Sequence, residues 1–459
     1  MTLFALNKCS LLIFLLCFAS YHCIFFDNNS IICFLGDSIT QGGYFHNSIF
    51  QFYITRYPEI DLSFNNCGIS GDTLTDLWQR LDEDVFVKNL TTAVIMFGMN
   101  DLGGYRFRSR GDPRNFDDIQ AYNSSLYSLL KLINAKGMKI ILQTPTIYDN
   151  TARMKSPLAR HKNAVLYSAT TIVKRFGESF GIPVVDYWQI LTYINSILQA
   201  QNLSSTIIGP DRVHPGMPAN FVMSYQFLKT LEGPSPVSHI VLARDLLLSV
   251  NQSINCVIHT IERTVDGLVK AEVTEGSLPF VVLKSQEPAL LHVPFIRDFN
   301  TELLRVVDLP GDDWHFFRVV IDDVTIGNFT RLDLNDGINL AVMKHSPQYK
   351  QATEVQKALT EFQRLDQKTR QIKHTEYRLL KEYFANGTRS KKCEDVNITD
   401  IAEFINGSQS LSKPQQITLE AYLKNKPRES FLYERMNHLR AKARQLAIPK
   451  QRSFFISPA

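Results

Sequence analysis

Between residues 31 and 232, short apolar runs alternate with segments whose apolar residues recur at helical spacing. The runs predict strands at residues 31–35, 62–65, 93–97, 139–143 and 183–186. The segments between them predict helices at about residues 45–57, 73–88, 117–136, 157–179 and 216–230. This alternation is typical of an α/β fold, in which a parallel sheet lies between two layers of helices.

The pattern changes after Glu232. Gly233 and Pro234 begin a linker that leads into a helical bridge at about residues 239–253. Short β-type runs and turns then predict a small antiparallel β-sandwich, followed by charged segments with helical spacing. We therefore expect an α/β domain at 30–232, a linker and helix at 233–254, a β-sandwich at 255–345 and a helical C-terminal region at 346–459.

The N-terminus has the pattern of a secretory signal peptide. Lys8 precedes an apolar run at residues 11–18, and the small residues Ala19 and Ser20 follow it. The run is too short to span a membrane comfortably, so we expect removal of residues 1–22 and a protein that is secreted or held in the secretory-pathway lumen. An uncleaved membrane anchor and an apolar N-terminal strand of a cytosolic protein are the alternatives.

Glycosylation signals favour export from a eukaryotic cell. A chain of this composition would contain about three or four Asn-x-Ser/Thr sites by chance. It contains nine, at Asn28, Asn89, Asn123, Asn202, Asn251, Asn328, Asn386, Asn397 and Asn406.

The cysteines indicate neither a disulfide scaffold nor a zinc site, because only five follow the expected signal peptide and their spacing suits no metal. Cys33 and Cys67 lie at the ends of two strands that should be close neighbours, which allows a bridge. We expect buried free thiols instead. The hydrophobic content of 44% is that of a globular protein, and a net charge of +4 is too small to indicate a nucleic-acid partner.

Four polar blocks lie at the ends of apolar runs or in loops of the α/β region. They are GDSIT at residues 36–40, NCGISGDT at 66–73, GMND at 98–101 and DRVHP at 211–215. Ser38, Gly71 and Asn100 each follow the carboxyl end of their own predicted strand. Because ligands bind beyond the carboxyl ends of parallel strands, these three residues should face one crevice.

The residue types in these blocks fit nucleophilic catalysis. Serine is a poor nucleophile at neutral pH, so it needs a positioned base and an acid partner that orients the base. Ser38, His214 and Asp211 supply the three groups. Asp211 and His214 are three residues apart in a loop flanked by proline and glycine, so one tight turn can place both beside the serine.

With these four blocks in this order, residues 30–232 resemble the SGNH (GDSL-type) serine esterase and lipase family. The resemblance implies a three-layer, flavodoxin-like hydrolase domain with a parallel sheet. It also implies a triad of Ser38, Asp211 and His214, and an oxyanion hole formed by the backbone N–H groups of Ser38 and Gly71 and the side-chain amide of Asn100. An ester would be hydrolysed through an acyl-enzyme on Ser38, without a metal or cofactor.

The sequence does not select the substrate. Secretion and the appended β-sandwich favour a secreted esterase that removes acetyl groups from a carbohydrate or glycoconjugate. A lipid or lysophospholipid carboxylesterase is the alternative, and an acyltransferase or a non-catalytic binding protein on the same fold are further ones. The intact triad argues against the binding protein. We expect an ester substrate, no nucleic-acid partner, and membrane association only through an uncleaved N-terminal segment.

Overall fold

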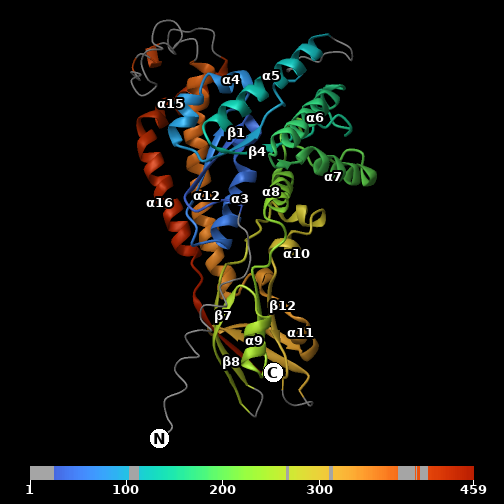
Figure 1. The fold of residues 1–459 in the computed structure, drawn as a ribbon, viewed down its shortest axis with the longest axis vertical. Coiled ribbons are helices and arrows are strands. Elements are labelled where there is room, and N and C mark those ends of the chain that lie inside the picture. Colours follow the sequence, from blue (N-terminus) through green and yellow to red (C-terminus); the bar gives the residue numbers. More distant parts are fainter. Residues whose placement is uncertain are drawn as a thin grey trace.

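The computed structural model describes residues 25–102, 113–264, 268–309, 314–380, 399, 401–403 and 412–459. The expected signal peptide at 1–22 therefore lies outside the described residues. The molecule is elongated, with the α/β domain at one end and a β-sandwich at the other (Figure 1). Two long helices, α12 (Pro347–His374) and α16 (Glu429–Ala447), run side by side from the sandwich along the α/β domain. None of the described helices combines the length and apolarity needed to cross a membrane.

The α/β domain contains a five-stranded sheet in the order β2-β1-β3-β4-β5. Every neighbouring pair in this sheet is parallel. This is the flavodoxin-like strand order, so the predicted fold class is confirmed. The strands are β1 (Ser30–Gly36), β2 (Leu62–Gly68), β3 (Thr92–Met96), β4 (Lys139–Gln143) and β5 (Val184–Val185).

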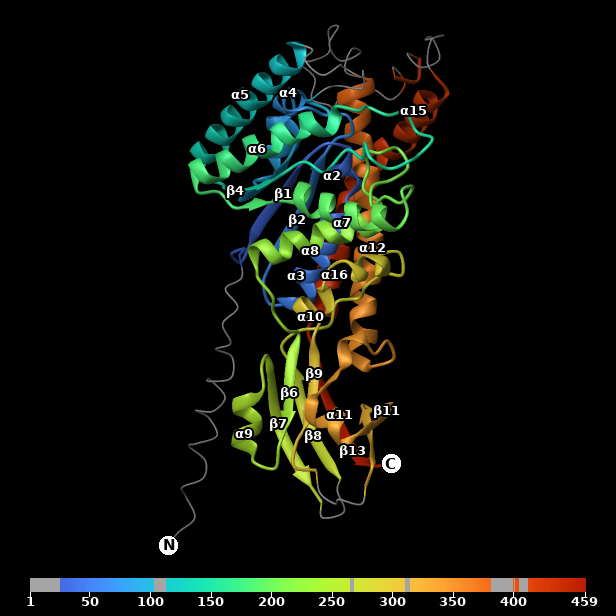
Figure 2. The same ribbon diagram turned by 90° about the vertical axis from the view of Figure 1, so that its right-hand side faces the viewer.

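Helices cover both faces of this sheet because successive strand side chains point to opposite faces. In β1, Ile32 and Phe34 belong to one apolar core, and Leu35 belongs to the other. Figure 2 shows α5 and α6 on one side of the sheet and α12 on the other. The first core takes residues from α3 (Tyr44–Arg56), α7 (Tyr187–Gln201), α8 (Met217–Leu231), α12 and α16. The second takes residues from α4 (Leu74–Trp78), α5 (Pro113–Ala135) and α6 (Lys162–Phe180).

A disulfide joins Cys33 in β1 to Cys67 at the end of β2. The expectation of free thiols at these two positions is therefore wrong. Cys33 pairs with Asn65 in the parallel register, and Cys67, two residues further along β2, points to the same face. The two Cα atoms lie 5.9 Å apart, within the range that a disulfide spans. Cys256 is buried and unbridged.

The β-sandwich has two sheets that share one apolar core. The larger sheet is antiparallel, in the order β11-β10-β13-β8-β7, and the smaller has the order β12-β9-β6. The larger contains β7 (Cys256–Arg263), β8 (Val269–Glu275), β10 (Phe316–Ile321), β11 (Val324–Thr330) and β13 (Gln451–Pro458). The smaller contains β6 (Ser238–Leu242), β9 (Glu302–Val306) and β12 (Ile338–Asn339).

Three details of this region differ from the prediction. The sandwich is not wholly antiparallel, because β6 and β9 pair in parallel. β6 replaces the start of the expected helical bridge, which is reduced to α9 (Leu246–Gln252). β13 comes from the C-terminal end of the chain, outside the expected sandwich range. A short apolar run such as that of β6 fits either a strand or a helix, and here pairing with β9 decides it.

The apolar run at residues 280–283, one of the short β-type runs from which the sandwich was predicted, does not form a strand. It lies in a segment that leaves the sandwich and packs on the α/β domain, where Phe280 and Phe295 join the core of α3 and α8. The Gln51 side-chain amide donates a hydrogen bond to the Val281 carbonyl at 3.0 Å. An α3 side chain therefore satisfies this backbone group, which a neighbouring strand would otherwise bind.

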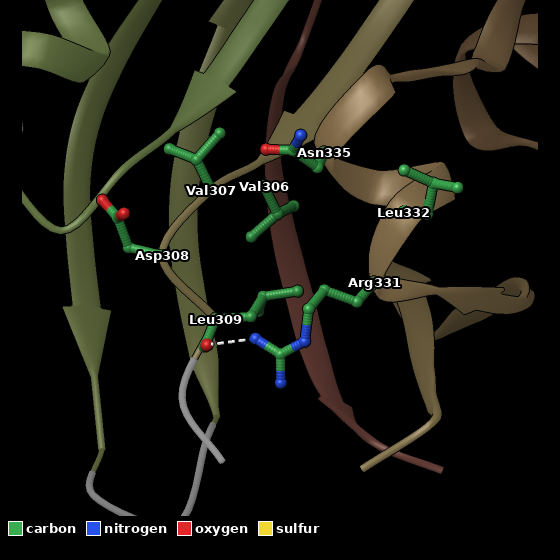
Figure 3. A pocket seen from close by; sticks show the side chains of 7 residues that line it. All are labelled: Val306, Val307, Asp308, Leu309, Arg331, Leu332 and Asn335. Atoms are coloured by element: carbon green, nitrogen blue, oxygen red, sulfur yellow. Dashed lines mark hydrogen bonds between the residues drawn. The ribbon is translucent and has the colours of Figure 1, made fainter. Parts of the chain in front are cut away.

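A hollow of about 370 Å³ opens on the sandwich between the end of β9 and α11 (Arg331–Asp336) (Figure 3). The Arg331 guanidinium lies over the Phe317 ring, 5.5 Å from its centroid, and donates to the Leu309 carbonyl. The residues that line the hollow are Val306, Val307, Asp308, Leu309, Arg331, Leu332 and Asn335. None of the predicted catalytic residues lines it.

Two buried carboxyl groups meet where the sandwich joins α12. Glu275 ends β8, and its carboxylate accepts hydrogen bonds from Ser238 Oγ at 2.5 Å and Gln348 Nε2 at 3.1 Å. Glu302 begins β9 and is also fully buried. Burial raises the pKa of Glu302 well above its usual range, and the neighbouring charge of Glu275 raises it further. Glu302 therefore keeps a proton at pH values where an exposed glutamate is ionised.

We predict that this proton makes the folded state less stable as the pH rises. The folded protein binds a proton that the unfolded chain releases above a pKa of about 4.3, so stability falls as the pH rises through the raised pKa of folded Glu302. Glu302→Gln cannot ionise and should reduce this decline. Thermal unfolding of both proteins between about pH 5 and 9 measures the effect. Identical declines would contradict the prediction.

Candidate active site

Ser38 lies at the junction between β1 and α2 (Ser38–Gly42). Asp37 caps the helix, and its carboxylate accepts a hydrogen bond from the Ile39 N–H at 2.9 Å. Burial raises the pKa of Asp37 to about 6. As the first residue of the helix, Ser38 has a backbone N–H without a partner inside α2. The turn therefore presents both the hydroxyl and the N–H of Ser38 beyond the carboxyl end of β1.

The structure brings Ser38, His214 and Asp211 into one hydrogen-bonded chain. His214 Nε2 lies 2.7 Å from Ser38 Oγ, and His214 Nδ1 lies 2.5 Å from Asp211 Oδ2. Because a carboxylate only accepts, Nδ1 carries the proton and Nε2 accepts the serine proton. Partial burial opposes ionisation of Asp211, but hydrogen bonds from the His214 ring and from the N–H groups of His214 and Val213 hold its pKa below its usual range.

Arg212, between the acid and the base, is a residue that sequence reasoning missed. Its guanidinium is buried and donates hydrogen bonds to the carbonyls of Asp149 at 2.9 Å, Ala152 at 3.0 Å and Met154 at 3.2 Å. Its backbone has φ of +68°, which is uncommon for a residue other than glycine. Arg212 therefore anchors the catalytic loop to residues 149–154. An arginine in a polar loop is usually exposed, so the sequence carried no signal of this role.

The predicted oxyanion residues follow neighbouring strands. Ser38 follows β1, Gly71 follows β2 and Asn100 follows β3, and these strands are adjacent in the sheet. Gly71 has φ of +83°, a conformation that glycine adopts without steric cost. Asn100 Nδ2 donates to the Asp72 carbonyl at 3.0 Å. Because an amide nitrogen carries two hydrogens, this bond orients the Asn100 amide and leaves a second donor.

Asp101 holds together the two loops that contain the predicted oxyanion residues Gly71 and Asn100. Its carboxylate accepts one hydrogen bond from the Leu74 N–H at 2.8 Å and another from the Gly98 N–H at 3.0 Å. Burial raises the pKa of Asp101 to about 7. The loop after β2 and the loop after β3 are therefore held to a common carboxyl group, next to the predicted oxyanion donor Asn100.

This arrangement contains the groups needed for acyl transfer. A serine hydroxyl, a base and an acid partner are in hydrogen-bonding contact, and helix-terminal and side-chain N–H donors lie on the adjacent loops. Within the described parts of the chain, no group of three or more His, Cys, Asp or Glu side chains has an arrangement that could hold a metal ion.

Comparison with known proteins agrees with this geometry. Residues 34–218 match the model of the GDSL-like lipase/acylhydrolase family. The α/β domain is therefore of the GDSL-like lipase/acylhydrolase type. It is a carboxylic ester hydrolase of the GDSL-like type. The family match spans β1 to the start of α8 and includes Ser38, Gly71, Asn100, Asp211 and His214.

Two relatives extend the comparison of this GDSL-like hydrolase. An acetylxylan esterase of Geobacillus stearothermophilus is 27% identical over 176 residues, which cover 38% of this chain and 74% of that protein. The structure of BT4096, a gut microbial diltiazem-metabolizing enzyme, superposes with a TM-score of 0.81 at 26% identity. That match covers 95% of this chain and 98% of the other, so the likeness extends to the sandwich and the C-terminal helices.

The roles of the triad residues stay predictions, which substitutions test. Ser38→Ala and His214→Ala should each lower kcat/KM for nitrophenyl acetate by about 10⁴-fold or more, because nucleophile and base act as one unit. Asp211→Asn should cost less, because the base survives without its orienting partner. Ser196→Ala, an exposed serine of α7, is the matched control. Wild-type activity in folded His214→Ala would exclude the triad.

Proposed function

We propose that this hydrolase removes acetyl groups from hydroxyl positions of a carbohydrate or glycoconjugate. The observation that carries the hydrolytic part is the unbroken chain of hydrogen bonds from Ser38 through His214 to Asp211. The likeness to an acetylxylan esterase supports the acetyl and carbohydrate parts, since the alignment spans 74% of that protein.

The geometry supports the following reaction. Ser38 Oγ attacks the ester carbonyl carbon while its proton passes to His214 Nε2, and Asp211 stabilises the imidazolium through Nδ1–H. The carbonyl oxygen becomes an oxyanion that the N–H groups of Ser38 and Gly71 and the amide of Asn100 stabilise. The tetrahedral intermediate expels the sugar hydroxyl, which takes the proton from His214. Water, activated by His214, then hydrolyses the acetyl-serine and releases acetate.

A substrate panel tests this proposal. We expect acetate release from acetylated xylooligosaccharides, and faster cleavage of nitrophenyl acetate than of nitrophenyl octanoate. Ser38→Ala is the control that ties each activity to this site. Release of fatty acid from a lysophospholipid at a higher kcat/KM than release of acetate would favour the lipid alternative. Acetylated sugar products formed from nitrophenyl acetate and free sugar acceptors would show acyl transfer instead of hydrolysis.

We further propose that the protein enters the secretory pathway and acts outside the cell or in the pathway lumen. The Cys33–Cys67 disulfide supports this, because disulfides persist mainly in oxidising compartments. The sequons support it as well. Those at Asn386, Asn397 and Asn406 lie outside the described residues. Among the others, the asparagine is exposed at Asn28, Asn89, Asn202, Asn251 and Asn328.

Asn123 provides an internal control for glycosylation. It lies within α5, is only half-exposed, and its side-chain oxygen accepts a hydrogen bond from Arg175. We predict that protein secreted from a eukaryotic host carries glycans at the exposed sequons and none at Asn123. Peptide mass spectrometry after N-glycosidase treatment in heavy-oxygen water measures each site. Retention of unglycosylated protein in the cytosol would contradict the proposed localisation.

A further inference from the structure

Helix α12 contacts the helix that carries the proposed nucleophile. The side-chain amide of Gln367 donates to the Gly42 carbonyl at 2.9 Å, and that of Gln363 lies 3.5 Å from the same oxygen. Gly42 is the last residue of α2, and the last carbonyls of a helix have no partner inside it. α12 therefore supplies the partner that holds the end of the short helix beginning at Ser38.

The same stretch of α12 also contacts the point where β2 ends and the loop with the proposed oxyanion donor Gly71 begins. Asp366 Oδ2 accepts from Asn66 Nδ2 at 2.9 Å, and Asn66 Oδ1 accepts from the Gly68 N–H at 3.0 Å. Arg370 Nε donates to the Gly68 carbonyl at 3.1 Å, across 302 residues of sequence. Both backbone polar groups of Gly68 are thus tied to α12, one directly and one through Asn66.

Gly68 is also where the oxyanion loop touches the nucleophile helix. A Cβ atom at this position would lie 2.4 Å from the Gln41 backbone nitrogen and 2.8 Å from the Thr40 carbonyl carbon. Only glycine permits this approach of two backbones. A displacement of Gly68 would therefore push against α2, and the chain reaches Gly71 only three residues later.

A buried charge cluster fixes Arg370. Its two Nη atoms donate to the two carboxylate oxygens of Asp84, each at 2.8 Å. Arg80 donates to Asp84 at 2.7 Å and to Asp72 at 2.8 Å, and none of these four side chains is more than 2% exposed. Burial opposes ionisation of Asp84, yet Arg370 and its other cationic neighbours hold its pKa well below its usual range. Arg370 consequently has little freedom to leave Gly68.

Gln363, Asp366, Gln367 and Arg370 lie on one face of α12, because residues three and four apart are neighbours on a helix. We propose that this face is a positioning element of the hydrolase, which sets the separation between the Ser38 hydroxyl and the oxyanion donors. It acts through the backbones of Gly42 and Gly68. This inference rests on the proposed function, in which Ser38 is the nucleophile and Gly71 and Asn100 stabilise the oxyanion.

Catalysis is sensitive to such a separation. A misplacement of about 1 Å can cost 10²-fold in rate, because donors must meet the oxyanion of the transition state. Binding of a small ester depends less on this spacing, since the oxyanion is absent from the ground state. A loosened α12 face should therefore lower kcat and leave KM nearly unchanged, whereas a general loss of stability would lower only the number of active molecules.

The test uses the full-length enzyme with Arg370→Gln, which removes the bond to Gly68 and leaves Asp84 paired with Arg80. Active sites are counted by covalent labelling with a fluorophosphonate, so unfolded molecules do not enter the rate. We expect kcat per site for nitrophenyl acetate to fall at least about tenfold, with KM within about twofold of wild type. Asn100→Ala provides the benchmark of direct donor loss, about 10²- to 10³-fold in kcat.

Arg440→Gln is the matched control. Arg440, on α16, donates to Ser63 Oγ at the opposite end of β2, away from the oxyanion loop. This variant should lower the melting temperature and keep the wild-type kcat per site. Gln367→Leu tests the same face of α12 without changing the buried charged side chains. If Arg370→Gln does not fold, the kcat per site of Gln367→Leu is the test of the positioning role.

The outcomes separate this inference from the proposed function. The positioning role would be overturned if folded Arg370→Gln kept a kcat per site within about twofold of wild type. If Arg370→Gln does not fold, the same result in Gln367→Leu would overturn it. An equal fall in kcat per site in Arg440→Gln would overturn it too. Full activity of Ser38→Ala would instead overturn the proposed function. Loss of kcat in the α12 variants, with Arg440→Gln unaffected, would establish the role.

Discussion

The proposed active site depends on a contact between two backbones, that of Gly68 at the end of β2 and that of α2 after β1. Adjacent parallel strands bring these loops to one edge of the sheet, but strand pairing alone ends at Gly36 and Gly68. Beyond that register, the proposed nucleophile and the proposed oxyanion donors lie on separate loops that other parts of the protein must hold. The Cys33–Cys67 disulfide, Asp101 and the face of α12 each contribute to this.

The sequence predicted the α/β domain well because its strands are buried on both faces. Continuous apolar runs mark such strands, and the ranges expected for β1 and β4 differ from the structure by at most one residue at each end. The sandwich was harder to predict. β13 has an apolar run of only three residues, and it forms a strand because β8 and β10 pair with it from distant parts of the chain. Strand pairing between such distant segments leaves no local signal.

The residues proposed to carry the chemistry could be found from the sequence, whereas those that support them could not. Ser38, Asp211 and His214 stand in short motifs whose residue types match a reaction, and the structure brings them into contact. Arg212 and Arg370 have no such motif. Each is a buried arginine whose partners are mainly backbone carbonyls or a carboxylate brought close by the fold. The disulfide was misjudged for a related reason, since the diagonal position of Cys33 and Cys67 depends on the exact register.

The path of the chain shows why the C-terminal region belongs physically with the catalytic domain. The chain leaves the α/β domain for β6, returns along α12, and goes back along α16 to β13 in the middle of the larger sheet. Both α12 and α16 are thus anchored in the sandwich at one end, where Gln351 on α12 contacts the carbonyls at the end of α16. The boundary expected at residue 232 separates the four sequence motifs from the C-terminal part of the chain. In the structure, hydrogen bonds and one apolar core join residues from both sides of this boundary. The sandwich therefore holds the base of the helix whose other end contacts Gly42 and Gly68.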